Sequence, residues 1–126
     1  MHSLAQGYQA LVFGATGAIG QAWVQQLHKD PRCAKVVEVS RQSTPGFDLL
    51  SETSMAVCAQ TLSKQAPFHL VLDATGVLML NGCSPEKRLQ ELDADHVLKL
   101  LHINAVGPSL LLKHFGPLLA SGERVI

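Results

Sequence analysis

The stretch Leu11-Val12-Phe13-Gly14-Ala15-Thr16-Gly17-Ala18-Ile19-Gly20 decides the fold, because three apolar residues run directly into three glycines spaced three apart. The apolar residues suit a buried strand, and a helical pattern begins immediately after the turn. A strand, a glycine turn and a helix N-terminus together direct free backbone N–H groups at one spot, where a phosphate binds well. Glycine accepts the unusual backbone angles of such a turn and lets a phosphate approach the amides. The same glycines are also compatible with a tight turn that binds nothing.

The composition indicates a single globular domain covering residues 1–126. Of these residues, 47% are hydrophobic and 16% are charged, which is enough apolar content for a real core. The formal net charge is zero, so we expect no nucleic-acid or membrane-surface partner, since either would require a basic face. The sequence has no apolar run of roughly 18 residues, and Met1–Ala10 lacks the apolar core of a signal peptide.

The cysteines and histidines predict neither disulfides nor a metal site. The three cysteines are Cys33, Cys58 and Cys83, which are too widely spaced to form a C-x-x-C pair. Such an odd, scattered set is typical of reduced thiols, so a cytoplasmic location is expected. None of the six histidines occurs in a metal-binding pair such as H-x-x-x-H.

Strands are expected to alternate with helices along the chain. The expected strands are 8–13, 34–40, a short one at 47–49, 68–74 and one from 123 that is cut off at the end of the chain. The first helix is predicted to bury Ile19, Ala22, Trp23 and Leu27 and to stop at Asp30-Pro31. A second helix, 51–65, has Ser51 as its N-cap and buries Cys58.

The second half of the chain has a longer connection and an apolar helix. Within the connection, 76–90, the segment Val77-Leu78-Met79-Leu80 either packs on the core or lines a pocket. Asp93 caps a helix that extends to about Leu119 and is apolar nearly all round. A helix of this kind is buried on more than one side. We therefore expect it to be covered, and homo-oligomerisation through this helix is one way to cover it.

This order, β-α-β-(β)-α-β-α-β, predicts an α/β fold: a doubly wound parallel sheet with right-handed crossovers, of the Rossmann type. Ligands of such folds bind at the carboxyl ends of the strands. The glycine turn, Arg41, Asp48 and Thr75-Gly76 all follow strands directly. The topology therefore gathers them on one edge of the sheet.

Taken together, these residues resemble the short-chain dehydrogenase/reductase family over nearly the whole chain. Gly14 to Gly20 is similar to the family's T-G-x-x-x-G-x-G cofactor loop, and Asp48-Leu49 to its adenine-holding Asp-Val or Asp-Leu pair. Asp73-Ala74-Thr75-Gly76 is similar to its N-N-A-G segment, and Asn104 to the asparagine of its catalytic tetrad. The resemblance implies a nicotinamide dinucleotide and a small carbonyl or alcohol substrate. The residues assigned to the cofactor include two at the end of the second expected strand, Ser40 and Arg41. The full set is Gly14, Thr16, Gly17, Ala18, Ile19, Gly20, Ser40, Arg41, Asp48, Leu49, Ala74, Thr75 and Gly76.

The chain departs from the family pattern in several places. Phe13 replaces the leading threonine, Ala18 the middle glycine, and Ala74 the second asparagine of N-N-A-G. The family's serine and Tyr-x-x-x-Lys have no counterpart, because the only tyrosine is Tyr8 and the sequence ends at Ile126, inside what is expected to be the fifth strand. Family members are about twice as long. The resemblance therefore implies the nucleotide-binding half of a dehydrogenase, and we expect these 126 residues alone to be inactive.

The strand ending at Ser40-Arg41 favours NADP over NAD. An acidic residue at this position binds the 2′-hydroxyl of NAD, whereas an arginine suits the 2′-phosphate of NADP. Glu38 lies two residues earlier and is expected to be too deep in the strand to reach the ribose. Arg41 as an ordinary solvated loop residue, and Asp48 as a loop or helix-capping carboxylate, are the alternatives.

Asn104 and Pro108 are four residues apart in the long helix. A proline has no N–H to donate to the carbonyl four residues earlier, so the carbonyl of Asn104 is expected to be free. The resemblance implies that a water at this carbonyl relays protons. An ordinary helix kink is the alternative.

Three functions are compatible with the sequence. The first is the NADP-binding part of an oxidoreductase whose serine, tyrosine and lysine lie beyond Ile126. The second is a non-enzymatic NADP(H)-binding regulatory or interaction module. The third is an apolar-surfaced fragment that associates with itself. The substrate is not readable from these residues.

Overall fold

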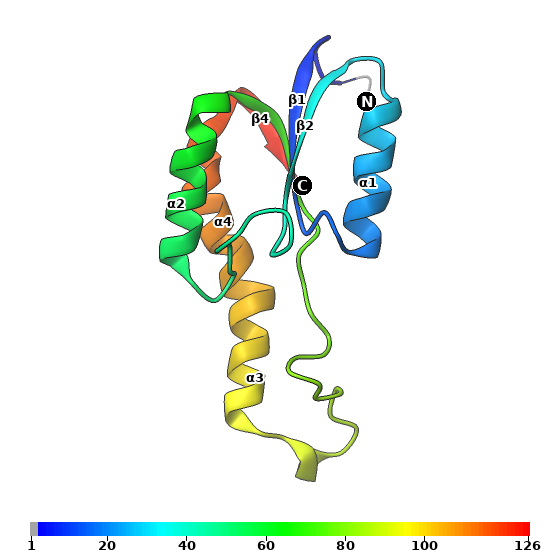
Figure 1. Ribbon diagram of the computed structural model, residues 1–126. Coiled ribbons are helices and arrows are strands. Elements are labelled where there is room, and N and C mark those ends of the chain that lie inside the picture. Colours follow the sequence, from blue (N-terminus) through cyan, green and yellow to red (C-terminus); the bar gives the residue numbers. More distant parts are fainter. Residues whose placement is uncertain (1–2) are drawn as a thin grey trace.

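The computed structural model describes residues 3–126, apart from the side chains of residues 122–125. Within these residues four parallel strands form one sheet in the order β2-β1-β3-β4. The strands are β1 (Tyr8–Phe13), β2 (Cys33–Val39), β3 (Phe68–Asp73) and β4 (Leu119–Val125). The helices are α1 (Ala18–Lys29), α2 (Glu52–Leu62), α3 (Ala94–Leu101) and α4 (Gly107–Phe115). Figure 1 shows α1 on one face of the sheet and α2 with α4 on the other, which confirms the predicted doubly wound α/β fold.

Strand β1 forms the centre of the molecule because both of its faces are buried. Successive side chains of a strand point to opposite faces. Ala10 and Val12 accordingly belong to a core cluster that includes Leu27 of α1. Leu11 and Phe13 belong to a second cluster under α2 and α4. In that cluster the rings of Phe13 and Phe115 meet edge to face, with centroids 4.6 Å apart.

Residues 47–49 do not form the short strand expected from the sequence. The backbone of Asp48 is bonded to the Ser54 hydroxyl, which donates to the Asp48 carbonyl at 2.9 Å and accepts from its N–H at 3.0 Å. The backbone N–H and carbonyl of Asp48 therefore bond to a nearby side chain and not to a strand of the sheet. Phe47 is buried for another reason, since its ring stacks on Phe13 at 5.8 Å. The terminal strand is consequently the fourth of the sheet and not the fifth.

The buried face of α1 agrees with the prediction at Leu27, which is buried, and at Trp23, which packs against the core, but not at the other two positions. The helix buries Gly20, Val24 and Leu27, whereas Ile19 is 69% exposed and Ala22 is also exposed. The cause is Gly20, which packs directly against the backbone of Gly14. This close approach rotates the face containing residues 20, 24 and 27 toward the sheet.

Other helix boundaries follow the predicted capping residues. The Ser51 hydroxyl accepts the N–H of Ser54 at 3.2 Å, and the Asp93 carboxylate accepts the N–H of His96 at 2.8 Å. Helix α1 ends at Lys29, immediately before Asp30-Pro31. Cys58 lies in the core as predicted, and burial raises the pKa of its thiol.

The predicted long helix is made of two α-helices joined by a π-helical turn. The turn covers His102–Val106, and a 3₁₀ turn, Gly116–Leu118, precedes β4. Figure 1 shows α3 extending beyond the edge of the sheet. No residue of α3 is buried, and Leu98 and Leu101 are 62% and 53% exposed. The expectation that this part is covered on several sides is therefore wrong within this chain.

The described residues contain neither a membrane-spanning helix nor a cluster of metal ligands. Between residues 3 and 126, no helix is long and apolar enough to cross a membrane. In the same part of the chain, no group of three or more histidine, cysteine or acidic side chains is arranged to hold a metal ion.

Candidate functional site

A cavity of about 430 Å³ lies at the carboxyl ends of the parallel strands. It brings together most residues that the sequence assigned to a site: Gly14, Thr16, Gly17, Ser40, Arg41, Asp48, Leu49, Ala74, Thr75 and Gly76. Further lining residues are Leu50, Val77, Met79, Leu80, Asn81 and Ile103. This is the position at which ligands bind in open α/β sheets.

The glycine turn is fixed by contacts with both neighbouring strands. The N–H of Gly14 donates to the carbonyl of Val39 at 3.0 Å, and Gly17 donates to the carbonyl of Gly14 at 3.0 Å. Gly14 has φ +72°, and a Cβ there would lie 2.5 Å from the carbonyl oxygen of Ala74. Only glycine fits this position, because an L-residue would suffer both the angle and the clash.

The N-terminus of α1 borders the cavity through Gly17, which lines it. Ala18, Ile19 and Gly20, which the sequence also assigned to the cofactor, are not among the residues that line the cavity. Gly17 is the N-cap, it supplies no side-chain hydrogen bond, and the first turn contains no acidic residue. Free amides and the positive end of a helix together attract an anion.

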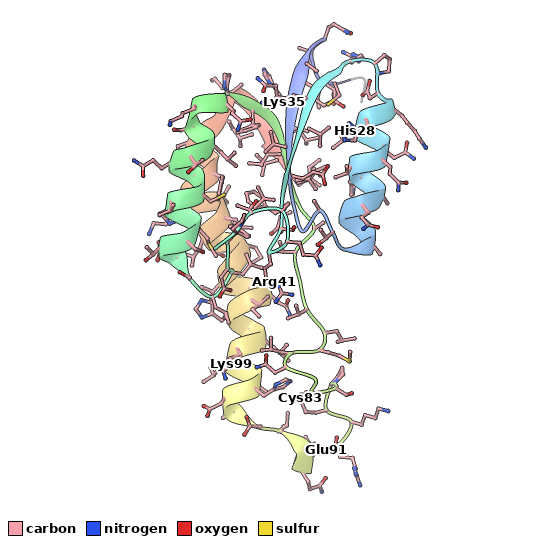
Figure 2. The ribbon with its side chains drawn as sticks, viewed as in Figure 1. His28, Lys35, Arg41, Cys83, Glu91 and Lys99 are labelled. Carbon is pink, nitrogen blue, oxygen red and sulfur yellow. The ribbon has the colours of Figure 1, made fainter. Side chains whose placement is uncertain are left out.

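Ser40 and Arg41 form the turn that follows β2. The Ser40 hydroxyl is buried and accepts the N–H groups of Gln42 (3.2 Å) and Ser43 (2.9 Å). It therefore shapes the turn. The side chain of Arg41 is exposed, and in the described part of the chain its guanidinium has no ion-pair or hydrogen-bond partner. Figure 2 shows it at the carboxyl end of the sheet, near the start of the connection between β3 and α3.

Asp48 and Leu49 form the wall of the cavity next to α4. One carboxylate oxygen of Asp48 accepts a hydrogen bond from the N–H of Leu50 at 2.9 Å. This contact agrees with the alternative interpretation, in which Asp48 is a carboxylate that stabilises its own loop. Leu49 lies beside Gly107 at the start of α4, where an added Cβ would be 3.6 Å from the leucine side chain. Through Leu49, the loop that precedes α2 therefore contacts the start of α4.

Asn104 does not line the cavity but holds one of its walls. Its side-chain oxygen accepts the N–H of Val77, and its side-chain nitrogen donates to the carbonyl of Val77, both at 2.8 Å. This two-point contact fixes the start of the segment Val77–Leu80. Val77, Met79 and Leu80 line the cavity, so that segment lines a pocket, one of the two alternatives the sequence left open.

The π-helical turn lies directly before Pro108. The N–H of Gly107 donates to the carbonyl of His102, five residues earlier, so the helix is widened at this point. Proline removes a helical donor, and prolines and π-bulges are both known sites of helix kinks. The free carbonyl expected at Asn104 remains a prediction. The side-chain contact with Val77 was missed, because the sequence indicates a polar residue on a helix but not its partner.

A second, larger cavity of about 520 Å³ lies between β2 and α2 and includes Glu38. Its lining lacks the glycine turn, and the N-terminus of α2 that borders it is already capped by the Ser51 hydroxyl, so we place the site at the other cavity. Glu38 does not line the candidate site, and its predicted distance from the ribose stays a prediction. Its carboxylate lies 3.9 Å from Nε2 of His28 on α1.

No protein-family model and no curated protein sequence matches this chain. Solved structures do match its fold. A small-chain dehydrogenase in complex with NADPH superposes with a TM-score of 0.73 and 20% identity, over 94% of this chain and 49% of that one. An NADPH-bound carbonyl reductase from chicken fatty liver has a TM-score of 0.73 and 16% identity, over 91% and 49%. A short-chain dehydrogenase/reductase from Serratia marcescens has a TM-score of 0.71 and 19% identity, over 95% and 56%.

These matches define the fold of the chain as an open, doubly wound α/β sheet. More narrowly, the chain has the fold found in short-chain dehydrogenases/reductases, as the sequence predicted. It spans about half the length of the matching structures, from 49% to 57% in the first three.

Proposed function

We propose that this chain is the NADP(H)-binding part of an oxidoreductase of the short-chain dehydrogenase/reductase type. The observation that carries the proposal is that one cavity is lined both by Arg41, whose guanidinium has no partner among the described residues, and by Gly17, the N-cap of α1, which has no side-chain cap. Two anion-binding features in one cavity suit a ligand with a pyrophosphate and a separate 2′-phosphate. Two of the matching structures contain NADPH, which supports the same choice of cofactor.

The residues of the site fit this cofactor by chemistry. The amides of Ala18, Ile19 and Gly20 would hold the pyrophosphate, Arg41 the 2′-phosphate, and Asp48 with Leu49 the adenine. When bound, the nicotinamide would exchange a hydride with a carbonyl or alcohol carbon of a small substrate. The described residues bind and orient the cofactor, and Asn104 holds the wall formed by Val77–Leu80.

Tyr8 cannot serve as the proton donor of such a reaction. It lies at the amino end of β1, is fully buried, and its hydroxyl donates to Asp30 at 2.9 Å. Burial, followed by this hydrogen bond, raises the pKa of the phenol well above its usual range. We therefore propose that the 126 residues alone bind the cofactor without turnover.

Thermal denaturation tests the proposal. A ligand that binds only the folded state stabilises it by about 2.7 kcal/mol at 100 times its dissociation constant. We expect NADP⁺ at millimolar concentration to raise Tm by several degrees and NAD⁺ at the same concentration to raise it less. A Tm that neither nucleotide changes, measured by far-ultraviolet circular dichroism, would contradict the proposal.

A second candidate function, a non-enzymatic NADP(H)-binding interaction module, is favoured by the exposed face of α3. Leu98 and Leu101 are three residues apart and so are neighbours on the helix surface. We propose a second copy of the chain as the partner for this face. Sedimentation should then give a dimer at micromolar concentration, and Leu101→Glu should give a monomer. A monomeric wild type would exclude this pairing.

A further inference from the structure

Strand β2 has a free edge that the proposed function does not use. It stands first in the order β2-β1-β3-β4 and pairs with β1 alone. Successive residues of a strand direct their N–H and C=O groups to opposite edges. The carbonyl of Val39 faces β1, because the N–H of Gly14 donates to it at 3.0 Å. The backbone groups of Ala34, Val36 and Glu38 therefore face the free edge.

Most of these outward groups are unbonded within the chain. The Ser43 hydroxyl donates to the carbonyl of Glu38 at 3.3 Å, which agrees with the outward direction of that carbonyl. In the described part of the chain, the N–H and C=O groups of Ala34 and Val36 have no hydrogen-bond partner. An edge of this kind is a template for pairing with a further extended chain.

The cavity of about 520 Å³ between β2 and α2 borders this strand. Val37 and Val39 line it from β2, and both pack in the core cluster under α2 and α4. Val57 lines it from α2 and is 58% exposed, so this wall is open to solvent. A strand that pairs with β2 would place every second side chain beside these apolar residues.

The charge of the cavity favours a basic residue on such a strand. Among the described residues that line the cavity, Glu38 alone is charged. Its side chain is 43% exposed, and its carboxylate lies 3.9 Å from Nε2 of His28, beyond hydrogen-bond distance. Opposite charges that face each other across two strands attract, and like charges repel. Lys or Arg therefore suits the position opposite Glu38, and apolar residues suit the positions opposite Val37 and Val39.

We infer that β2 binds an extended segment of another polypeptide as an added antiparallel strand, with a basic residue between two apolar residues placed opposite Glu38. Main-chain hydrogen bonds give such a complex its affinity, and alternate side chains give it specificity. Antiparallel pairing is slightly more stable per residue than parallel pairing. The segment would lie outside the proposed cofactor site, since the two cavities share no lining residue.

Fluorescence anisotropy with the whole chain and a labelled peptide tests this pairing. The probe is a fluorescein-labelled, C-terminally amidated Ser-Val-Lys-Val-Val-Glu-Ser peptide, whose lysine lies opposite Glu38. Its last valine then lies opposite Val36 and directs its N–H at β2. We expect N-methylation of that valine to weaken binding about tenfold, as for the loss of a hydrogen bond. N-methylation of the preceding valine is the matched control and should leave the affinity unchanged, because its N–H points away from β2.

Variants of the chain test the side-chain contacts. Val57→Asn should weaken binding of the peptide about threefold, because it places a polar group in the apolar wall. Leu112→Asn is its control, since Leu112 is 54% exposed on α4 and lies outside this cavity. Glu38→Lys should reverse the preference between the probe and a second peptide with glutamate in place of its lysine, by up to about fivefold each way.

Several results would overturn the added strand. They are no binding of the probe at millimolar concentration, and an equal response to the two N-methylated peptides. Displacement of the probe by saturating NADP⁺ would place it in the cofactor cavity, so the added strand would be wrong while the proposed function stands. If the probe does not bind and the chain instead forms a dimer that Val57→Asn abolishes, the edge binds a second copy and not another polypeptide.

Discussion

Gly20→Ala is expected to lower the free energy of unfolding by about 2–3 kcal/mol, since overpacking of a close contact has effects of this size. A Cβ at Gly20 would lie 2.1 Å from the carbonyl oxygen of Gly14 and 2.8 Å from its carbonyl carbon. Both are backbone atoms of the glycine turn, so neither can move without shifting α1 away from β1. In a domain of this size the loss corresponds to a fall in Tm of about 10 °C.

Gly17→Ala is the matched control for this prediction. Its Cβ would meet only the Gly14 carbonyl oxygen, at 3.4 Å, and its φ of −75° is compatible with alanine. We expect Tm to stay close to the wild-type value. The added methyl group would lie on a residue that lines the cavity, so NADP⁺ affinity should fall by about tenfold, in line with one disturbed charge-assisted hydrogen bond. Equal stability of the Gly20 variant and the wild type would refute the packing argument.

Arg41→Ala is expected to weaken NADP⁺ binding by roughly 10- to 100-fold and to leave NAD⁺ binding unchanged. A hydrogen bond between a guanidinium and a phosphate contributes about 1.5–3 kcal/mol, and only NADP⁺ has the 2′-phosphate. Arg41 has no competing partner among the described residues, so nothing in this part of the chain has to be broken for it to bind.

Lys64→Ala provides the control for charge. Lys64 is exposed, lies in the 3₁₀ turn Ser63–Gln65 and does not line the cavity. The Lys64→Ala substitution removes one positive charge, as Arg41→Ala does, but lies outside the site. The affinities for NADP⁺ and NAD⁺ should therefore equal those of the wild type. An Arg41 variant that keeps its preference for NADP⁺ would show that another residue reads the 2′-phosphate.

Local signals predicted the elements that form the site. Glycine spacing located the turn at Gly14, and capping chemistry located the starts of α2 and α3 at Ser51 and Asp93. Alternation of strands and helices was sufficient to predict that Arg41, Asp48 and Thr75 gather at one edge of the sheet. The turn, the helix starts and the grouping at the sheet edge depend on residues close in sequence or on the order of the elements. They can therefore be predicted from a single sequence.

Features set by tertiary contacts were not predictable in the same way. Residues 47–49 have the composition of a strand, but the Ser54 hydroxyl occupies the backbone of Asp48. The apolar stripe through Ile19 is as regular as the one through Val24, and only the contact between Gly20 and Gly14 decides between them. The partner of Asn104 lies 27 residues away along the chain. Asn104 bonds to Val77 because the connection between β3 and α3 passes beside the π-helical turn.

The most direct test of the account is the ratio of the NADP⁺ and NAD⁺ dissociation constants of the purified chain, measured by titration calorimetry under identical ionic conditions. If the cavity at the carboxyl end of the sheet is an NADP(H) site read by Arg41, NADP⁺ binds with one-to-one stoichiometry and at least about tenfold more tightly than NAD⁺. Equal affinities, or tighter binding of NAD⁺, would contradict the account.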